Sequence, residues 1–171
     1  GSGYERKGLP TLLAAFARLP GDKSELWVVG HDKQQAIMRR QAVRLGIADR
    51  VRFFGAQKDV RPFYGAADLF VLPTRYDPFP NAALEALACG LPVVTTTSCG
   101  AAELITEANG MVVAANDVAA LADAINALSL PGRAEAMRDA ARASVNGLDL
   151  ASMAQRLTTL YAQSLAVKLS M

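Results

Sequence analysis

Residues 69–95, LFVLPTRYDPFPNAALEALACGLPVVT, contain the repeating unit of the fold: a strand, a loop, a helix and a second strand. The apolar run at 69–72 is typical of a strand that is buried on both faces. A helix is predicted over 81–89, and Gly90 and Pro92 end it before the second apolar run at 92–95. This order predicts two parallel strands joined by a crossover helix.

The same alternation extends along most of the chain. Further strands are expected at 26–29, 51–54 and 111–113, and further helices at 9–19, 33–45, 59–67, 101–106, 117–128, 133–145 and 150–166. The pattern predicts an α/β fold in one domain, residues 1–171: a Rossmann-like, doubly wound parallel sheet with extra helices at its C-terminal end. Those last three helices either cover the sheet or include one that extends as an arm toward a missing partner.

The composition excludes several classes of protein. With 171 residues, 51% of them hydrophobic, and a net charge of +2, the chain can fold around one core and is not disordered. Cys89 and Cys99 are too few for a disulfide framework or a four-cysteine zinc site, which favours a reducing, cytoplasmic compartment. No cleavable signal is expected. The longest uncharged stretch, 86–102, contains Gly90 and Pro92, so no membrane span is expected.

The charge is unevenly distributed. Residues 1–85 carry 13 basic and 9 acidic side chains, whereas residues 86–171 carry 5 and 7. A nucleic-acid-binding protein would show a denser basic face with aromatic residues among the cations, so nucleic acid is not expected as a partner. The positive excess of the first half suits a small anionic ligand.

In an open parallel sheet, ligands bind beyond the carboxyl ends of the strands, so the loops that follow strands are the places to search. Loop 1–8 carries Arg6 and Lys7 just before a helix. Two cations beside the positive end of a helix dipole could bind a diphosphate, although on spacing alone a solvated basic turn is the simpler interpretation.

The loop after strand 26–29 contains Gly30 and His31. His31 is the only histidine, and the residues near it do not resemble a catalytic triad or a zinc site, so we interpret it as a surface residue. Gly30 would allow the backbone to approach a ligand closely. No G-x-G-x-x-G follows a strand, which disfavours a dinucleotide-dependent dehydrogenase.

The loop after strand 69–72 carries the strongest signal. It presents Asp77, and Asn81 and Glu85 share one face of the helix that follows. The free N–H groups of residues 80–83 would face an anionic or polyhydroxyl ligand. Because the helix is apolar, Glu85 is expected to be buried, where its carboxylate would need a partner such as a sugar diol. The alternative makes Asp77 a turn residue and Glu85 an exposed helix residue.

The segment from Asp77 through Glu85 to Val94 resembles the donor-binding signature of the GT-B retaining glycosyltransferases of family four, in which seven residues separate two acidic residues. Three further matches are Arg6-Lys7-Gly8-Leu9, Val28-Val29-Gly30 and Val51-Arg52-Phe53-Phe54-Gly55. The resemblance covers about residues 1–128 and, within the family, is closest to the lipopolysaccharide core α-1,3-glucosyltransferases. It implies that the chain is the C-terminal, donor-binding half, without the N-terminal half that binds the acceptor.

The resemblance also implies roles for individual residues. Lys7, helped by Arg6, would hold the donor diphosphate, Glu85 would bind the ribose, and Asp77 would contact the transferred sugar. These implied catalytic residues, Asp77, Lys7 and Glu85, are joined by donor-binding positions at Gly30, Gly55, Gln57, Phe79, Pro80, Asn81 and Ala82. Gly55 and Gln57 lie where the nucleobase packs, and the stretch 79–82 lies where backbone groups meet sugar and phosphate.

Three positions depart from the family pattern. Asp77 replaces a glutamate and is one methylene shorter, Pro80 replaces a glycine and lacks an N–H, and Ser2 stands where an arginine often occurs. The shorter carboxylate of Asp77 and the missing N–H of Pro80 bear on which sugar is bound. The arginine's absence shifts the phosphate charge onto Lys7 and Arg6.

The function expected is therefore donor binding in an enzyme that moves a hexose from a nucleoside diphosphate sugar, UDP-linked, to a glycan or lipid-linked acceptor. No cofactor is expected, and no metal, because no two acidic residues are separated by a single residue as in an Asp-x-Asp clamp. These 171 residues alone are expected to be inactive in transfer. The alternatives are a sugar-nucleotide epimerase of similar shape and a non-catalytic α/β interaction module.

Overall fold

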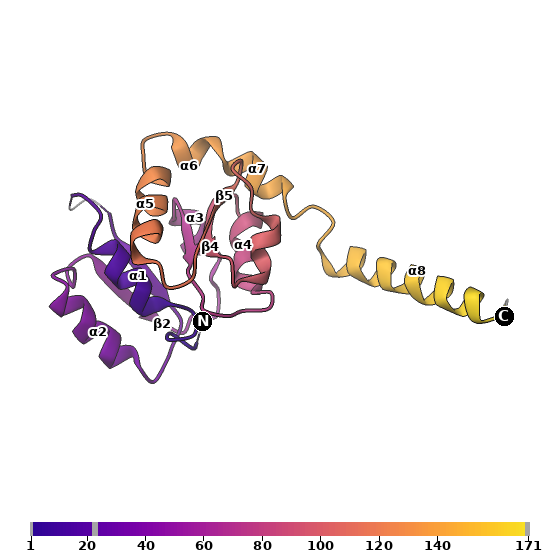
Figure 1. Cartoon of the computed structure of the whole chain (residues 1–171), viewed down its shortest axis with the longest axis horizontal. Coiled ribbons are helices and arrows are strands. Elements are labelled where there is room, and N and C mark those ends of the chain that lie inside the picture. The colour runs from indigo at the N-terminus through magenta and orange to yellow at the C-terminus, as the bar shows by residue number, and fades with distance from the viewer. Residues whose placement is uncertain (1, 22–23, 170–171) are drawn as a thin grey trace.

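The computed structural model describes residues 2–21 and 24–169, so Gly1 of the expected basic loop lies outside the described residues. It contains five short parallel strands: β1 (Leu26–Val29), β2 (Val51–Gly55), β3 (Phe70–Leu72), β4 (Val93–Thr96) and β5 (Gly110–Val113). The helices are α1 (Leu9–Phe16), α2 (Gln35–Arg44), α3 (Arg61–Ala66), α4 (Asn81–Ala88), α5 (Val118–Leu128), α6 (Arg133–Ala136), α7 (Arg138–Ala143) and α8 (Leu150–Leu169). The α/β class is confirmed (Figure 1).

Helices cover both faces of the strands. Val93 and Val94 are neighbours on β4, so their side chains point to opposite faces, and each enters a different apolar cluster. The Val94 cluster includes buried residues of α1, α2 and α5, and the Val93 cluster includes buried residues of α4 and α7. This double burial explains why the strands are continuous apolar runs in the sequence.

The expectation of one continuous sheet is wrong. The strands form a two-stranded sheet, β1-β2, and a three-stranded sheet, β3-β4-β5. A cavity of about 730 Å³ lies between them, lined mainly by apolar residues of β1, β3, α1 and α3. Alternating strands and helices specify parallel strands, but they do not specify which neighbouring strands are hydrogen-bonded, and this explains the error.

Two expected helices also differ. The helix predicted at 133–145 is divided at Met137 into α6 and α7, and the helix predicted at 101–106 is a 3₁₀ helix, Gly100–Leu104. The 3₁₀ helix begins at Gly100, whose backbone packs so closely on the Pro78 carbonyl that an added Cβ would overlap it. This contact holds the start of the segment against the loop after β3.

The last helix, α8, extends away from the rest of the molecule (Figure 1). Apolar residues along it are exposed, namely Leu150, Met153, Leu157, Leu160, Tyr161 and Leu165. Of the two arrangements considered for the C-terminal helices, α8 therefore adopts the arm, whereas α6 and α7 pack on the body. Among the described residues, no helix has the length and apolar character needed to cross a membrane.

Candidate functional site

The basic loop before α1 packs against the loop that follows β3, as the site prediction requires. The carbonyl of Arg6 accepts hydrogen bonds from the backbone N–H of Arg75 at 2.8 Å and from the Thr74 hydroxyl at 3.0 Å. Gly8, with φ of +76°, lies so close to Pro73 that an added Cβ would overlap the Pro73 carbonyl. Segments about 70 residues apart in the sequence thus meet at the carboxyl end of β3.

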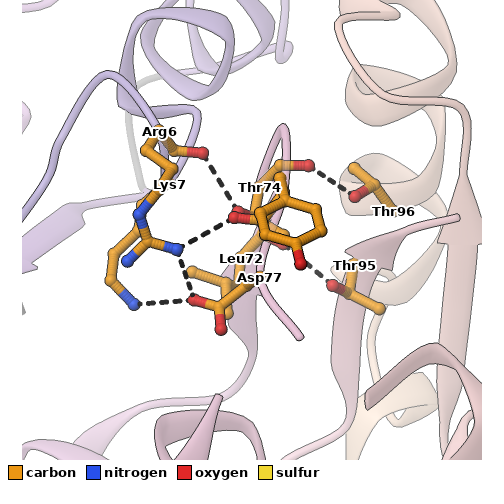
Figure 2. Close-up of polar contacts among 8 residues, drawn as sticks. Arg6, Lys7, Leu72, Thr74, Asp77, Thr95 and Thr96 are labelled. Carbon is orange, nitrogen blue, oxygen red and sulfur yellow. Dashed lines mark hydrogen bonds and ion pairs between the residues drawn. The ribbon is translucent and has the colours of Figure 1, made fainter. Parts of the chain in front are cut away.

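Asp77 binds both cations of the basic loop through one carboxylate oxygen (Figure 2). Its Oδ2 lies 3.0 Å from Arg6 Nη1 and 3.3 Å from Lys7 Nζ, and Arg6 Nη1 also donates to the Tyr76 carbonyl at 2.9 Å. Asp77 is 8% exposed, whereas the Arg6 guanidinium is half exposed. The cluster carries two positive charges and one negative charge, so a net positive charge remains at the edge of the sheet.

The start of the basic loop is held by Asp32, which the sequence analysis did not single out. Asp32 Oδ2 accepts from the backbone N–H of Gly3 at 2.7 Å and of Tyr4 at 3.2 Å. The N–H of Gln34, and then those two, hold the pKa of Asp32 below its usual value because they stabilise the carboxylate form. The bond between Asp32 and Gln34 forms a local turn, which a sequence pattern can indicate. The bonds from residues 3 and 4 to Asp32 join distant parts of the chain, which a local pattern cannot indicate.

Three buried threonines join the strands beneath this cluster (Figure 2). The Thr95 hydroxyl donates to the Leu72 carbonyl at 2.9 Å, and the Thr96 hydroxyl donates to the Thr74 carbonyl at 2.6 Å. Thr74 in turn donates to Arg6, so two hydroxyls connect β4 to the basic loop. These hydroxyl bonds were not predicted from the sequence.

The burial predicted for Glu85 is wrong, because the residue is exposed. Its helix neighbours Ala86 and Leu87 are buried on another face, whereas Glu85 shares the exposed face with Asn81, four residues earlier. The inference that burial requires a ligand partner therefore fails. Its carboxylate accepts from the Tyr64 hydroxyl of α3 at 3.0 Å. Burial, and then this hydrogen bond, raise the pKa of Tyr64, so the hydroxyl remains a donor at neutral pH.

The amino end of α4 lies in the same loop region. Pro80 is the N-cap, no side chain caps the first turn, and that turn contains no acidic residue. The helix geometry leaves the N–H groups of Asn81 and Ala82 without partners inside the helix. In the predicted stretch 79–82, Phe79 and Asn81 are exposed, Ala82 is partly exposed and Pro80 is buried.

Gly30, predicted to allow close approach to a ligand, lies just after β1, and the two residues predicted for the nucleobase, Gly55 and Gln57, lie at the end of β2 and in the loop after it. Gly30 donates its N–H to the Gly55 carbonyl at 2.7 Å, and its own carbonyl accepts from the Tyr4 hydroxyl at 2.8 Å. The exposed amide of Gln57 donates to the Phe54 carbonyl at 2.8 Å. These hydrogen bonds order the loops but do not join them to Asp77. The structure thus brings Arg6, Lys7 and Asp77 together, and Tyr4 links the basic loop to Gly30, whereas none of these hydrogen bonds joins Gln57 to Asp77.

The 730 Å³ cavity extends to the candidate site, because Lys7, Tyr64 and Ala82 are among its lining residues. Its volume lies within the range of about 300–1,000 Å³ that is usual for small-molecule sites. The basic loop, the first turn of α4 and the partner of Glu85 therefore border one space. Within the described part of the chain, no three His, Cys, Asp or Glu residues group as metal ligands do.

Known proteins resemble this chain in both sequence and structure. The family described as Glycosyl transferases group 1 matches residues 1–130. LpsE of Rhizobium meliloti strain 1021, a lipopolysaccharide core biosynthesis glycosyltransferase, is 42% identical over 122 residues, which are 71% of this chain and 35% of LpsE. The lipopolysaccharide glucosyltransferase WaaG of Escherichia coli K12 is 39% identical over 118 residues, 67% of this chain and 31% of WaaG.

Two solved structures share the fold. A crystal structure of WaaG, a glycosyltransferase involved in lipopolysaccharide biosynthesis, aligns with a TM-score of 0.82 and 32% identity over 94% of this chain and 45% of WaaG. Anabaena HepE, crystallised with UDP and glucose, aligns with a TM-score of 0.86 and 26% identity over 95% of this chain and 47% of HepE.

The chain belongs to the group 1 glycosyl transferase family. Its fold is that of the GT-B glycosyltransferases, as the sequence resemblance implied. It spans about a third of the length of the curated relatives described above.

Proposed function

We propose that this domain binds a nucleoside diphosphate hexose, UDP-linked, as the donor half of a retaining glycosyltransferase. The observation that carries the proposal is the placement of Arg6 and Lys7 on one carboxylate, at the carboxyl end of β3 and in the loop that leads into the uncapped helix α4. Cations and free backbone N–H groups at that edge are what a diphosphate requires. The HepE structure with UDP and glucose gives independent support for a uridine nucleotide.

Lys7 and Arg6 would bind the diphosphate, and the Asn81 and Ala82 N–H groups would complete its surroundings. The cluster already has a net positive charge, so a diphosphate enters a field that favours it. During transfer, negative charge develops on the departing diphosphate, and these groups would stabilise it in place. We therefore propose a transfer that uses side chains and a helix end, without a metal or other cofactor.

Asp77 and Glu85 would contact the two sugars of the donor. Asp77 is the only carboxylate in the ion cluster and would accept a hydroxyl of the hexose as the diphosphate takes over part of its pairing with the cations. Glu85 is exposed, and Tyr64 orients one of its oxygens, so the carboxylate is open to a ribose diol. The nucleobase would pack near Gly55 and Gln57, and the backbone at Gly30 would approach the donor.

The whole protein would carry the acceptor site elsewhere. The relatives are about three times as long as the matched segment, which supports a second half that binds a glycan or lipopolysaccharide-type acceptor. We propose that residues 1–171 form the donor-binding domain, inactive in transfer alone, of a cytoplasmic enzyme that acts at the inner face of the cell membrane.

Calorimetric titration of UDP into the 171-residue chain tests the proposal. Saturable binding is expected, weakened about tenfold or more by Lys7→Ala and by Glu85→Ala, because each removes a charged partner of the ligand. Arg40→Ala and Glu107→Ala are the matched controls, since each removes an exposed charge of the same sign elsewhere. If wild type binds UDP and neither Lys7→Ala nor Glu85→Ala weakens that binding, the assignment of the site is wrong. If wild type does not bind UDP, the non-catalytic interaction module is favoured.

A further inference from the structure

We propose that Thr74 is a positioning residue for donor binding, because its buried hydroxyl fixes the peptide group that joins the two cations. This inference rests on the proposed function. The Arg6 carbonyl belongs to the planar peptide between Arg6 and Lys7, so a bond that holds this carbonyl restrains the backbone from which both side chains leave. Thr74 Oγ1 donates to that carbonyl at 3.0 Å.

The hydroxyl is itself held in place from the sheet. Thr74 is 0% exposed, and its own carbonyl accepts from the Thr96 hydroxyl of β4 at 2.6 Å (Figure 2). Thr96 is also 0% exposed. A strand of the buried sheet thus fixes residue 74, and residue 74 fixes residue 6. The basic loop is therefore bonded to the buried sheet beside the residues that carry its charges.

The burial of the hydroxyl also indicates a role beyond filling space. Valine has nearly the same shape as threonine, and β4 uses Val93 and Val94 at positions that are equally buried. Burying a hydroxyl costs free energy unless the group has a hydrogen-bond partner. The partner of the Thr74 hydroxyl is in the basic loop rather than in another strand. The geometry therefore links this side chain to the placement of the cations.

The other bonds of the loop allow the effect to be isolated. The Arg6 carbonyl keeps its bond from the Arg75 N–H when the hydroxyl is removed, so the carbonyl is not left unpaired. The salt bridges of Asp77 and the bonds of Asp32 to the start of the loop do not involve Thr74. Thr74→Val should consequently fold while the Arg6–Lys7 peptide gains freedom.

The test is calorimetric titration of UDP into Thr74→Val, Thr74→Ser and a matched control, Thr95→Val. Thr95 is as buried as Thr74 and loses a similar bond, but its hydroxyl donates to the Leu72 carbonyl and not to the basic loop. We expect the Kd of UDP to rise about five- to tenfold in Thr74→Val and to stay within about twofold of wild type in Thr74→Ser and Thr95→Val. Thermal unfolding of all three checks that they are folded at the titration temperature.

A double-mutant cycle separates positioning from general stability. If Thr74 acts through the cations, Thr74→Val should have little further effect on the Kd in a chain that already carries Arg6→Ala and Lys7→Ala, measured at low salt. Equal effects in both backgrounds, an equal loss in Thr95→Val, or an unchanged Kd in Thr74→Val would overturn the inference. These outcomes presuppose that wild type binds UDP; failure of that binding would instead count against the proposed function.

Discussion

Replacing Asp77 by asparagine should make UDP bind more tightly. In the free protein the Asp77 carboxylate lies 3.0 Å from Arg6 Nη1 and 3.3 Å from Lys7 Nζ, where it competes with any other anion for these cations. Asparagine keeps the size of the side chain but removes the charge, so the net charge of the cluster rises by one. The substitution tests whether Arg6 and Lys7 are there to bind a phosphate.

The magnitude follows from Coulomb's law. A phosphate oxygen that shares Lys7 Nζ with Asp77 would lie about 5 Å from the carboxylate oxygen, given hydrogen-bond lengths to one nitrogen. Two unit charges at about 5 Å repel by about 0.8 kcal/mol in water and about 3 kcal/mol at an effective dielectric constant of about 20. Because the Arg6 side chain is half exposed, solvent screening favours the lower repulsion energy, about 0.8 kcal/mol. Removing this repulsion corresponds to about a fourfold fall in the Kd of UDP.

The backbone around Asp77 should hold its position without the carboxylate. Its N–H donates to the Ser98 carbonyl at 3.3 Å, and its carbonyl accepts from the Gly100 N–H at 2.9 Å. The basic loop keeps its bonds to Asp32, Thr74 and Arg75. We therefore expect the effect of Asp77→Asn to be electrostatic, largest at low salt and absent near 1 M, where the Debye length is about 3 Å.

The assay is calorimetric titration of UDP at low and high salt, with Asp139→Asn as the matched control. Asp139 also faces an arginine, Arg142, but lies on α7 and is fully exposed, so its removal should leave the Kd unchanged. The substitution Asp77→Asn should increase the affinity for UDP-glucose less than the affinity for UDP, because the hexose loses its carboxylate partner. A rise in the Kd of UDP would refute the reasoning, since it would mean that Asp77 holds the cations for the ligand rather than competing with it.

Two further substitutions test how the basic loop is built. Gly8→Ala should destabilise the fold and weaken UDP binding, because its methyl would overlap the Pro73 carbonyl. Gly132→Ala is the control, because Gly132 has nearly the same positive φ but open space around it. If Gly132→Ala lowers the melting temperature as much as Gly8→Ala does, backbone strain alone is the cause and the overlap is not. Asp32→Asn should lower stability at neutral pH and lose its effect in acid. The pKa of Asp32 is lower in the folded chain, so the carboxylate stabilises the fold above its unfolded pKa, and this contribution disappears as pH falls through the folded pKa. Urea unfolding of wild type and Asp32→Asn at pH 7 and near pH 3 measures this, and a constant difference between them would contradict it.

The sequence predicted the strands because they depend on local pattern. Apolar runs bounded by glycine and proline identified β3 and β4, and the loop between β3 and α4 contained Asp77. The exposure of Glu85 was missed because apolar neighbours on a helix do not determine the face on which one residue lies. Which strands would be hydrogen-bonded was missed for a similar reason, since the order of elements does not determine the distance between β1 and β3.

The bonds that tie the supporting residues to the basic loop could not be found from local pattern. Asp32 bonds to the backbone N–H groups of Gly3 and Tyr4, 29 and 28 positions away, and Thr74 bonds to the Arg6 carbonyl, 68 positions away. The partners are backbone groups, which nearly every residue possesses, so no sequence pattern marks these bonds. Tyr64, the partner of Glu85, is likewise 21 positions away on another helix.

The central claim is that a nucleoside diphosphate binds between the basic loop and the start of α4. Titration of the ¹⁵N-labelled chain with UDP, followed by amide NMR, tests it most directly. The account predicts saturable shifts of the Lys7, Gly8, Asn81 and Ala82 amides at one common Kd, with the amides of α7 unmoved. Shifts confined to other surfaces, or a saturating spectrum in which these four amides stay in place, would contradict it.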